Sequence, residues 1–171
     1  MRGVRNPETM TQAELKAALH YDPATGVFTW RSSAGQRRVQ IGAVAGSVKA
    51  TGYRELCVNG QCYVAHRLAW LYMTGRWPTA DIDHRNRSRD DNRFHNLREA
   101  TRMQNGQNRK PRAGSASGFT GVSRSGGKWC AVIMVAGRQR MLGRFDDLEL
   151  AKAARVAAER QQFTHAAREA A

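Results

Sequence analysis

The feature that most constrains the fold of this chain is a stretch that lacks core-forming side chains. Residues 111–118 read Pro-Arg-Ala-Gly-Ser-Ala-Ser-Gly and include no large apolar residue. Small, polar segments of this kind are typical of linkers, because they have nothing to bury in a hydrophobic core. The sequence therefore predicts two separately folded modules, at residues 11–110 and 119–165, preceded by a flexible start at residues 1–10.

Positive charge is spread over both predicted modules. The 171 residues include 28 Lys and Arg against 14 Asp and Glu, a formal net charge of +14, and 23 of the 28 cations are Arg. The planar guanidinium group of Arg binds phosphate through two hydrogen bonds, so this excess indicates a polyanionic partner such as nucleic acid. An arginine-rich composition that reflects a GC-rich genome is the alternative explanation.

The sequence lacks the signals of membrane and secreted proteins. No apolar run approaches the roughly 18 residues of a membrane span, and the N-terminus lacks the apolar core of a secretory signal. Three cysteines are too few, and odd in number, for a disulfide framework. We therefore expect a protein without membrane association, located in the reducing cytoplasm.

Short helices and strands are predicted along the first module. Thr11 and Glu14 have the spacing of a capping box, which predicts a helix that begins there. Alternating side chains flank Asn59-Gly60 and predict a β-hairpin at residues 52–65, because this dipeptide accepts the positive φ of a tight hairpin turn. A helix is predicted at residues 66–72.

A second strand pair is predicted further along the first module. Strands are expected at residues 81–84 and 97–100, separated by a polar loop at 85–96, and a helix at 101–110 follows. Together with the elements before it, this pattern predicts the α+β fold class.

The segment from Ile82 to Asn105 carries the most specific motif of the chain. It contains Ile82-Asp83-His84, Asp91-Asn92-Arg93-Phe94-His95-Asn96-Leu97-Arg98 and Thr101-Arg102-Met103-Gln104-Asn105. This pattern resembles the HNH nuclease motif and is most similar to that of phage HNH homing-type endonucleases. The resemblance implies a ββα-metal fold, in which two short strands and a helix surround one divalent metal ion. Residues 21–30 and 65–75 also resemble segments that precede the nuclease core in phage and prophage members.

The resemblance implies a metal site made by Asp83 and Asn105. A carboxylate and an amide oxygen are hard ligands that suit Mg²⁺ or Mn²⁺, and these ions keep open positions for phosphate and water. We therefore expect one divalent ion, Mg²⁺ or Mn²⁺, as the cofactor.

His84 is the expected general base of the reaction, and the resemblance implies that Asn96 holds the loop and keeps His84 oriented. Side chains alternate along a strand, so His84 is expected on the opposite face from Asp83, directed toward the scissile phosphate. His66 and His95 are alternative bases. We favour His84 because it combines the strand position with the flanking Asp of the motif.

Cys57 and Cys62 face each other across the predicted hairpin. With His66 they form part of a possible zinc site, but a fourth ligand and the usual ligand spacing are missing. We therefore expect two small, half-buried residues rather than metal ligands.

Residues 119–163 resemble the AP2 domain, a three-stranded antiparallel sheet with one helix. The resemblance lies in residues 118–123, 128–133, 142–145 and 151–158, and it implies a sheet that lies in the DNA major groove. Alternation places Trp129, Ala131, Ile133 and Val135 toward the helix and Lys128, Cys130, Val132 and Met134 outward, while Ala151, Ala154, Ala157 and Ala158 let the helix approach the sheet. The expected DNA-binding residues are Arg124, Lys128, Arg138, Gln139, Arg140 and Arg144. A small domain with an ordinary solvated basic face is the alternative.

The sequence thus predicts a metal-dependent endonuclease that nicks or cleaves double-stranded DNA and is anchored by its C-terminal module. Two alternatives belong to other classes. One is a DNA-binding regulator with a degenerate nuclease fold. The other is an RNA-binding basic protein, which the lack of an exposed aromatic stacking platform disfavours. The resemblance implies a phage-encoded or prophage protein that acts in the cytoplasm of a bacterial host.

Overall fold

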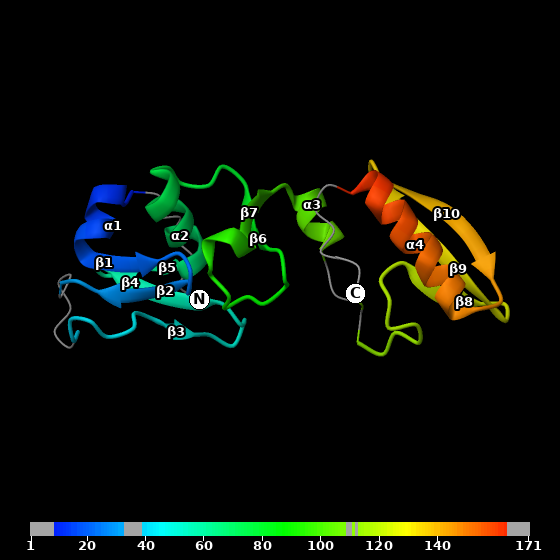
Figure 1. Ribbon diagram of the computed structural model, residues 1–171, viewed down its shortest axis with the longest axis horizontal. Coiled ribbons are helices and arrows are strands. Elements are labelled where there is room, and N and C mark those ends of the chain that lie inside the picture. The colour runs from blue at the N-terminus through cyan, green and yellow to red at the C-terminus, as the bar shows by residue number, and fades with distance from the viewer. Residues whose placement is uncertain (1–8, 33–38, 109–110, 112, 164–171) are drawn as a thin grey trace. The chain divides into compact units, whose positions relative to one another are not determined.

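The computed structural model describes residues 9–32, 39–108, 111 and 113–163. Residues 1–8 of the predicted flexible start and residue 112 of the predicted linker lie outside these residues. The chain forms two compact units, Met1–Thr101 and Arg102–Ala171 (Figure 1). Each unit mixes short helices with small antiparallel sheets, in agreement with the predicted α+β class. The predicted module boundaries remain predictions.

In its described residues, the first unit contains three small antiparallel sheets and two α-helices. The sheets have the strand orders β1-β2, β3-β4-β5 and β6-β7. The elements are α1 (Gln12–Ala18), β1 (Leu19–Asp22), β2 (Val27–Trp30), β3 (Ser47–Val48), β4 (Arg54–Val58), β5 (Gln61–Val64), α2 (Ala65–Thr74), β6 (Asp81–His84), the 3₁₀ helix η1 (Phe94–Asn96) and β7 (Leu97–Ala100).

Local sequence signals explain where the first helix and the first hairpin begin. The Thr11 side chain accepts a hydrogen bond from the Glu14 amide, and the Glu14 carboxylate accepts one from the Thr11 amide, which confirms the capping box. Asn59 and Gly60 both have positive φ, at 50° and 76°, and form the turn between β4 and β5. Strand β1 was not predicted, because its residues continue the chain directly from the end of α1.

Cys57 and Cys62 are direct cross-strand partners, as predicted, but they form a disulfide bond. This bond was not predicted. Of the two residues expected to be half-buried, Cys57 is half-buried and Cys62 is exposed. Both sulfurs are used in this bond, so the considered zinc site is not formed. Disulfides are rare in a reducing cytoplasm, and the cytoplasmic location remains a prediction.

The core of the first unit lies between the two helices and the sheets. Helix α2 packs on β4 and β5 and contacts α1, and Figure 1 shows both helices on the same side of these strands. Gly75, with φ of 77°, ends α2 in the left-handed conformation. The largest fully buried apolar side chains of this core are Tyr21, Phe28, Leu15, Leu19, Leu56, Leu68, Leu71 and Val58.

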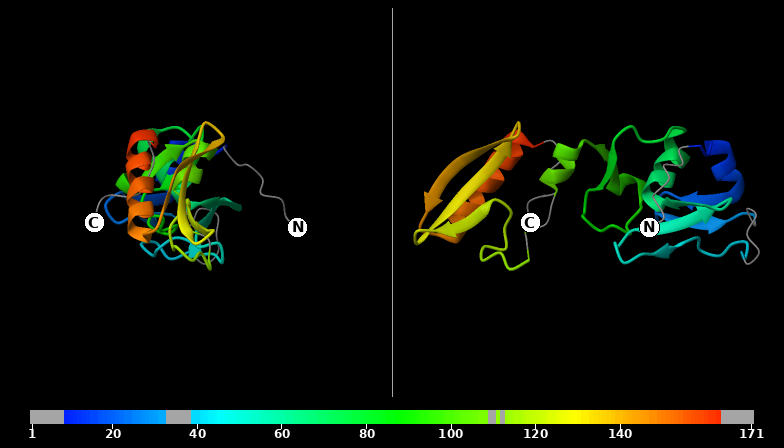
Figure 2. Two further views of the ribbon diagram at one scale, coloured as in Figure 1. Left: turned by 90° about the vertical axis from the view of Figure 1, so that its right-hand side faces the viewer. Right: turned by 180° about the vertical axis from the view of Figure 1, so that it is seen from behind.

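The second unit contains a three-stranded antiparallel sheet with one long helix across one face (Figure 2). The strand order is β10-β9-β8. The elements are α3 (Arg102–Gln107), β8 (Val122–Ser125), β9 (Lys128–Val135), β10 (Arg138–Phe145) and α4 (Leu148–Gln162). Asp147 caps α4 by accepting hydrogen bonds from the Glu149 and Leu150 amides. The sheet and helix have the order predicted from the sequence, although α3 is shorter than the predicted helix at 101–110.

The interface between sheet and helix differs from the prediction at several positions. Ala131 and Ile133 are buried and Met134 is exposed, as alternation predicts, but Cys130 is also buried. Ala151 alone of the four predicted alanines is fully buried, and Ala157 is exposed.

The buried positions of α4 after Ala151 are charged. They hold Arg155 and Glu159, which form an ion pair of 2.9 Å with both side chains 5% exposed. Gly121 lies against this pair, since an added Cβ would lie 2.4 Å from Arg155 Nε. The predicted placement of Ala154, Ala157 and Ala158 among the buried positions of α4 is therefore wrong. The buried positions of α4 recur every four residues, at Ala151, Arg155 and Glu159.

In the described part of the chain, no helix is both long and apolar enough to span a membrane.

Candidate active site

Asp83 and His84 lie at the end of β6, where the strand pairs with β7. The register places Asp83 opposite Arg98 and His84 opposite Leu97. Arg98 donates hydrogen bonds from Nε (2.9 Å) and Nη2 (2.7 Å) to Asp83 Oδ2, and both side chains are largely buried. The predicted metal ligand is therefore an ion-paired carboxylate in this structure.

Asn96 closes the loop between β6 and β7. Its Nδ2 donates to the Asp91 carbonyl (2.7 Å) and to Asn86 Oδ1 (3.0 Å), and its Oδ1 accepts from the Asn86 amide (3.0 Å). These are loop-holding bonds of the kind that the resemblance implies for Asn96. They tie Asn96, at the end of the loop, to Asn86 at its start and to Asp91 at its middle.

Asn92 connects the loop to His84. The Asn92 side chain is fully buried, and its Oδ1 lies 3.3 Å from His84 Nε2, while its Nδ2 donates to the Asp90 carbonyl. The Asn92 carbonyl accepts a hydrogen bond of 2.7 Å from the Tyr21 hydroxyl of β1. The core of the first unit thereby orients the imidazole through Asn92.

The turn between β1 and β2 supports the same loop from outside. The Phe94 amide donates to the Pro23 carbonyl (3.0 Å). Gly26 has φ of +76°, and a Cβ there would lie 2.4 Å from the Arg93 amide nitrogen and 2.5 Å from the Asn92 carbonyl carbon. A glycine is required at this position because the two backbones are in direct contact.

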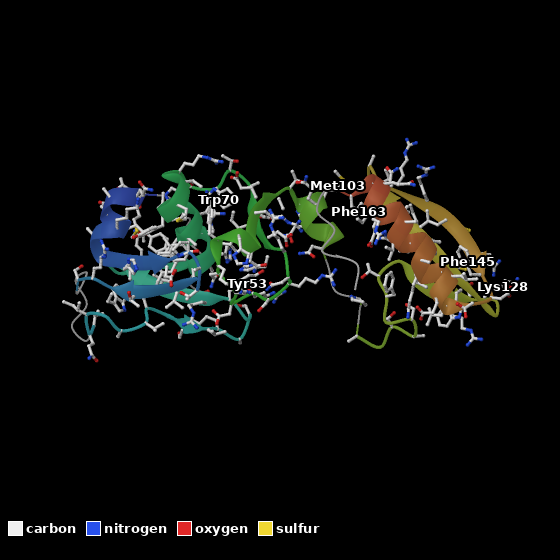
Figure 3. The ribbon with its side chains drawn as sticks, in the orientation of Figure 1. Tyr53, Trp70, Met103, Lys128, Phe145 and Phe163 are labelled. Carbon is white, nitrogen blue, oxygen red and sulfur yellow. A yellow bond between two sulfur atoms is a disulfide. The ribbon has the colours of Figure 1, made fainter. Side chains whose placement is uncertain are left out.

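Three aromatic rings meet beside β6. The ring centroid of His66, on α2, lies 5.1 Å from those of His84 and Tyr53, and Tyr53 lies 5.9 Å from His84. Tyr53 belongs to the turn before β4 and is labelled in Figure 3. His66 was predicted as an alternative base, but this residue is buried, with only 8% of its surface exposed.

Burial sets the protonation of both histidines. Desolvation lowers the pKa of His66 to about 3, with smaller effects from the nearby His84 and Arg67. Desolvation is also the largest cause that lowers the pKa of His84, and the hydrogen bond with Asn92 opposes it. Both rings are therefore neutral near pH 7. His84 is only 4% exposed, so the ring is more enclosed than the prediction of a base open to substrate assumed. His95, the third candidate, is exposed on η1.

Of the two predicted metal ligands, Asp83 lies in the first unit and Asn105 in the second. Asp83 offers a carboxylate, the chemistry that hard divalent ions prefer, but it shares this carboxylate with Arg98. Asn105 is half-buried on α3, which belongs to the second unit. Among the described residues, no cluster of three or more His, Cys, Asp or Glu has the arrangement of a metal site. The pairing of Asp83 with Asn105 remains a prediction.

The six predicted DNA-binding residues of the second unit are all exposed, and the strand register divides them between the two faces of the sheet. Direct cross-strand partners share a face. Arg138 and Arg140 pair with Val135 and Ile133, and Arg124 pairs with Trp129, so these three share the helix-covered face. Gln139, Arg144 and Lys128 lie on the opposite, open face.

Two of the three open-face residues are held by neighbours. Arg144 donates to the Ser125 carbonyl (2.9 Å), and Lys128 pairs with Asp146 at 3.0 Å. Met134 and Met141 are exposed by 53% and 65% on the same open face. This face thus combines cations, an amide and apolar side chains.

Comparison with known proteins identifies one part of the chain. Residues 63–107 match the HNH endonuclease family. The match spans 45 of the 171 residues, from β5 to the last residue of α3, and includes Asp83, His84, Asn96 and Asn105. It supports an HNH nuclease domain that acts on DNA. No curated protein and no solved structure matches the chain.

Several residues of the HNH site were not found by sequence reasoning. Asn92 and Arg98 lie within the quoted motif but were given no role. Tyr53 lies outside the matched segment, and no local signal indicates that its ring reaches His84.

Proposed function

We propose that this protein is a metal-dependent endonuclease that hydrolyses phosphodiester bonds of double-stranded DNA, by nicking or cleavage. The observation that carries the proposal is the β6–β7 hairpin of the HNH segment, in which Asp83 and His84 are consecutive residues at the end of β6 and Asn96 closes the loop to β7. The net charge of +14 supports a nucleic-acid substrate.

His84 is proposed to activate the attacking water. An amide oxygen only accepts hydrogen bonds, so the contact with Asn92 Oδ1 requires the proton of the neutral ring on Nε2. Nδ1 is then the nitrogen that can take a proton from water. The lowered pKa of His84 keeps this nitrogen unprotonated at neutral pH, which is the state that a general base needs.

Asp83 is proposed to hold one divalent ion, Mg²⁺ or Mn²⁺, together with Asn105 as the sequence predicts. A bound ion would supply positive charge to the phosphate as it becomes more negative during attack. The hydrogen bonds from Arg98 fix the orientation of the Asp83 carboxylate. Arg98 is thereby a positioning residue for the metal ligand.

A plasmid nicking assay tests the proposal. The wild-type protein should nick supercoiled DNA with Mg²⁺ or Mn²⁺ and stop in EDTA. His84→Ala should lower the rate by roughly 10²–10⁴-fold, the usual contribution of a positioned base, while binding to duplex DNA is retained. His95→Ala removes an exposed histidine of the same segment and serves as the matched control. Equal activity of His84→Ala and wild type would overturn the role of His84.

A non-catalytic DNA-binding regulator is the second candidate function. Two observations favour it: the Asp83 carboxylate is already paired with Arg98, and His84 is buried. Tight duplex binding without nicking by the wild-type protein, across both metals, would select this function.

We also propose that the second unit anchors the protein on DNA through the open face of its sheet, as the AP2 resemblance implies. The support is that this face is uncovered by α4 and carries Lys128, Gln139 and Arg144. Arg144→Gln and Arg140→Gln make the same change of charge on opposite faces. Arg144→Gln should weaken duplex binding more, and equal losses would contradict readout by the open face.

A further inference from the structure

Arg89 is an exposed residue of the loop after β6, yet its side chain is fixed by residues far away in the sequence. Its Nη1 donates a hydrogen bond of 2.7 Å to the Thr51 carbonyl, and its Cζ lies 5.1 Å from the centroid of the Tyr53 ring. Gly52 lies beneath the side chain, since a Cβ there would lie 3.4 Å from Arg89 Cδ. Residues 51–53 therefore hold the Arg89 side chain in a fixed position.

The way in which Arg89 is held differs from that of its neighbours. Arg54, Arg93 and Arg98 bind the carboxylates of Asp90, Asp91 and Asp83. Within the described residues, no Asp or Glu forms an ion pair with Arg89. A carbonyl and an aromatic ring orient a guanidinium group without neutralising its charge. Arg89 thus combines a fixed position with an uncompensated positive charge, which is what binding of an anion requires.

One of the residues that hold Arg89 also contacts the proposed active site. Tyr53 contacts Arg89 and also packs against His66 and His84. A single aromatic ring therefore links the fixed cation to the proposed base.

We propose that Arg89 binds a backbone phosphate of the DNA strand next to His84, and that Tyr53 and the Thr51 carbonyl hold it in place for this contact. The proposal rests on the proposed endonuclease function, since it places the phosphate of that substrate. Tyr53 lies outside the matched HNH segment, so the contact depends on a part of the chain that the family match does not cover.

The test measures DNA binding and DNA cleavage separately on the full-length protein. Binding of a short mixed-sequence duplex is followed by fluorescence anisotropy in EDTA over a series of salt concentrations. Arg89→Gln should weaken binding by about tenfold. It should also make the plot of log affinity against log salt less steep by about 0.9, the value for one lost phosphate contact.

Matched variants separate the contact from a general loss of charge. Arg31→Gln removes one cation that contacts Lys16 and His20, away from the Tyr53 ring, and should leave the salt dependence nearly unchanged. Arg89→Lys keeps the charge and should keep the slope. Tyr53→Phe keeps the ring beside Arg89 and should keep the slope of the salt plot, whereas Tyr53→Leu, which removes the ring, should approach Arg89→Gln. A thermal melt of each variant verifies folding.

The outcomes distinguish this proposal from the proposed function. If the wild-type protein nicks plasmid while Arg89→Gln binds DNA with unchanged affinity and slope, the phosphate contact is wrong and the nuclease stands. If Arg89→Gln and Arg31→Gln have equal effects, the contact is likewise wrong. If binding depends on Arg89 as expected but the wild-type protein nicks no DNA, the contact stands as part of a binding site and the nuclease function fails.

Discussion

Acid should destabilise the first unit through one buried histidine, His66. Its Nδ1 is buried without a hydrogen-bond partner, and desolvation lowers the pKa of the ring to about 3 from the ordinary value of 6.5. His66 therefore becomes protonated near pH 6.5 in the unfolded chain, but only near pH 3 in the folded unit. The contribution to stability is complete above pH 6.5 and is lost progressively as the pH falls toward 3.

The size of this loss follows from the difference between the two pKa values. Each pH unit in this window corresponds to about 1.4 kcal/mol per proton, so His66 alone should lower the free energy of unfolding by about 2 kcal/mol between pH 7.5 and pH 5. The pKa of His84 is lowered in the same direction and adds to the effect.

Urea unfolding at the two pH values measures this quantity. A Trp129→Phe background leaves the other three tryptophans, all in the first unit, as the fluorescence probe. His66→Phe keeps an aromatic ring in the cluster but cannot be protonated, so its pH-dependent loss should be smaller than that of the parent by about 2 kcal/mol. His95→Gln, which removes an exposed histidine, is the control.

The comparison uses the change with pH and not the absolute stability, so a packing defect in His66→Phe does not affect the conclusion. If His66→Phe and its parent lose the same free energy between pH 7.5 and pH 5, His66 is not kept neutral by burial, and the reasoning is refuted.

Three further predictions concern the metal, the disulfide and the loop. Asp83→Asn, which keeps the shape of the side chain but removes its charge, should lower Mg²⁺-dependent nicking by at least about 10²-fold, and Asn105→Ala should do the same if the second predicted ligand is correct. Replacing Cys57 and Cys62 by Ser should cost about 2 kcal/mol in urea unfolding, the entropy of a short closed loop, and wild type in dithiothreitol should match the variant. Gly26→Ala should lower the free energy of unfolding by more than about 2 kcal/mol in the same assay, because an added Cβ would meet the backbone of the loop. Gly60→Ala, with the same φ of 76° but open space around it, should lower it by only about 1 kcal/mol. Equal losses would contradict the role of the backbone contact at Gly26.

Local patterns in the sequence predicted the elements whose causes are local. The Thr11–Glu14 capping box and the Asn59-Gly60 turn each depend on residues within a few positions of one another. The three-strand and helix pattern of the second unit was predicted for the same reason, since alternation and turn glycines mark each strand.

The contacts that were missed join residues far apart in the chain. Tyr53 reaches His84 across 31 positions, and the Tyr21 hydroxyl reaches Asn92 across 71. Neither pairing leaves a signal in local periodicity. Arg155 was missed for a different reason, because a charged residue on an alanine-rich helix is expected to face solvent unless its partner four positions later is also buried.

The contact between the β1–β2 turn and the loop around Asn92 limits how the nuclease segment can be inherited. Recombination that moved only residues 63–107 into another protein would separate the Asn92 carbonyl from the Tyr21 hydroxyl and the Phe94 amide from the Pro23 carbonyl. The transplanted loop would also need a new partner whose backbone approaches as closely as Gly26 does. The portable unit is therefore larger than the segment that matches the HNH family. Gene exchange that preserves these contacts around His84 must carry the first two strands as well.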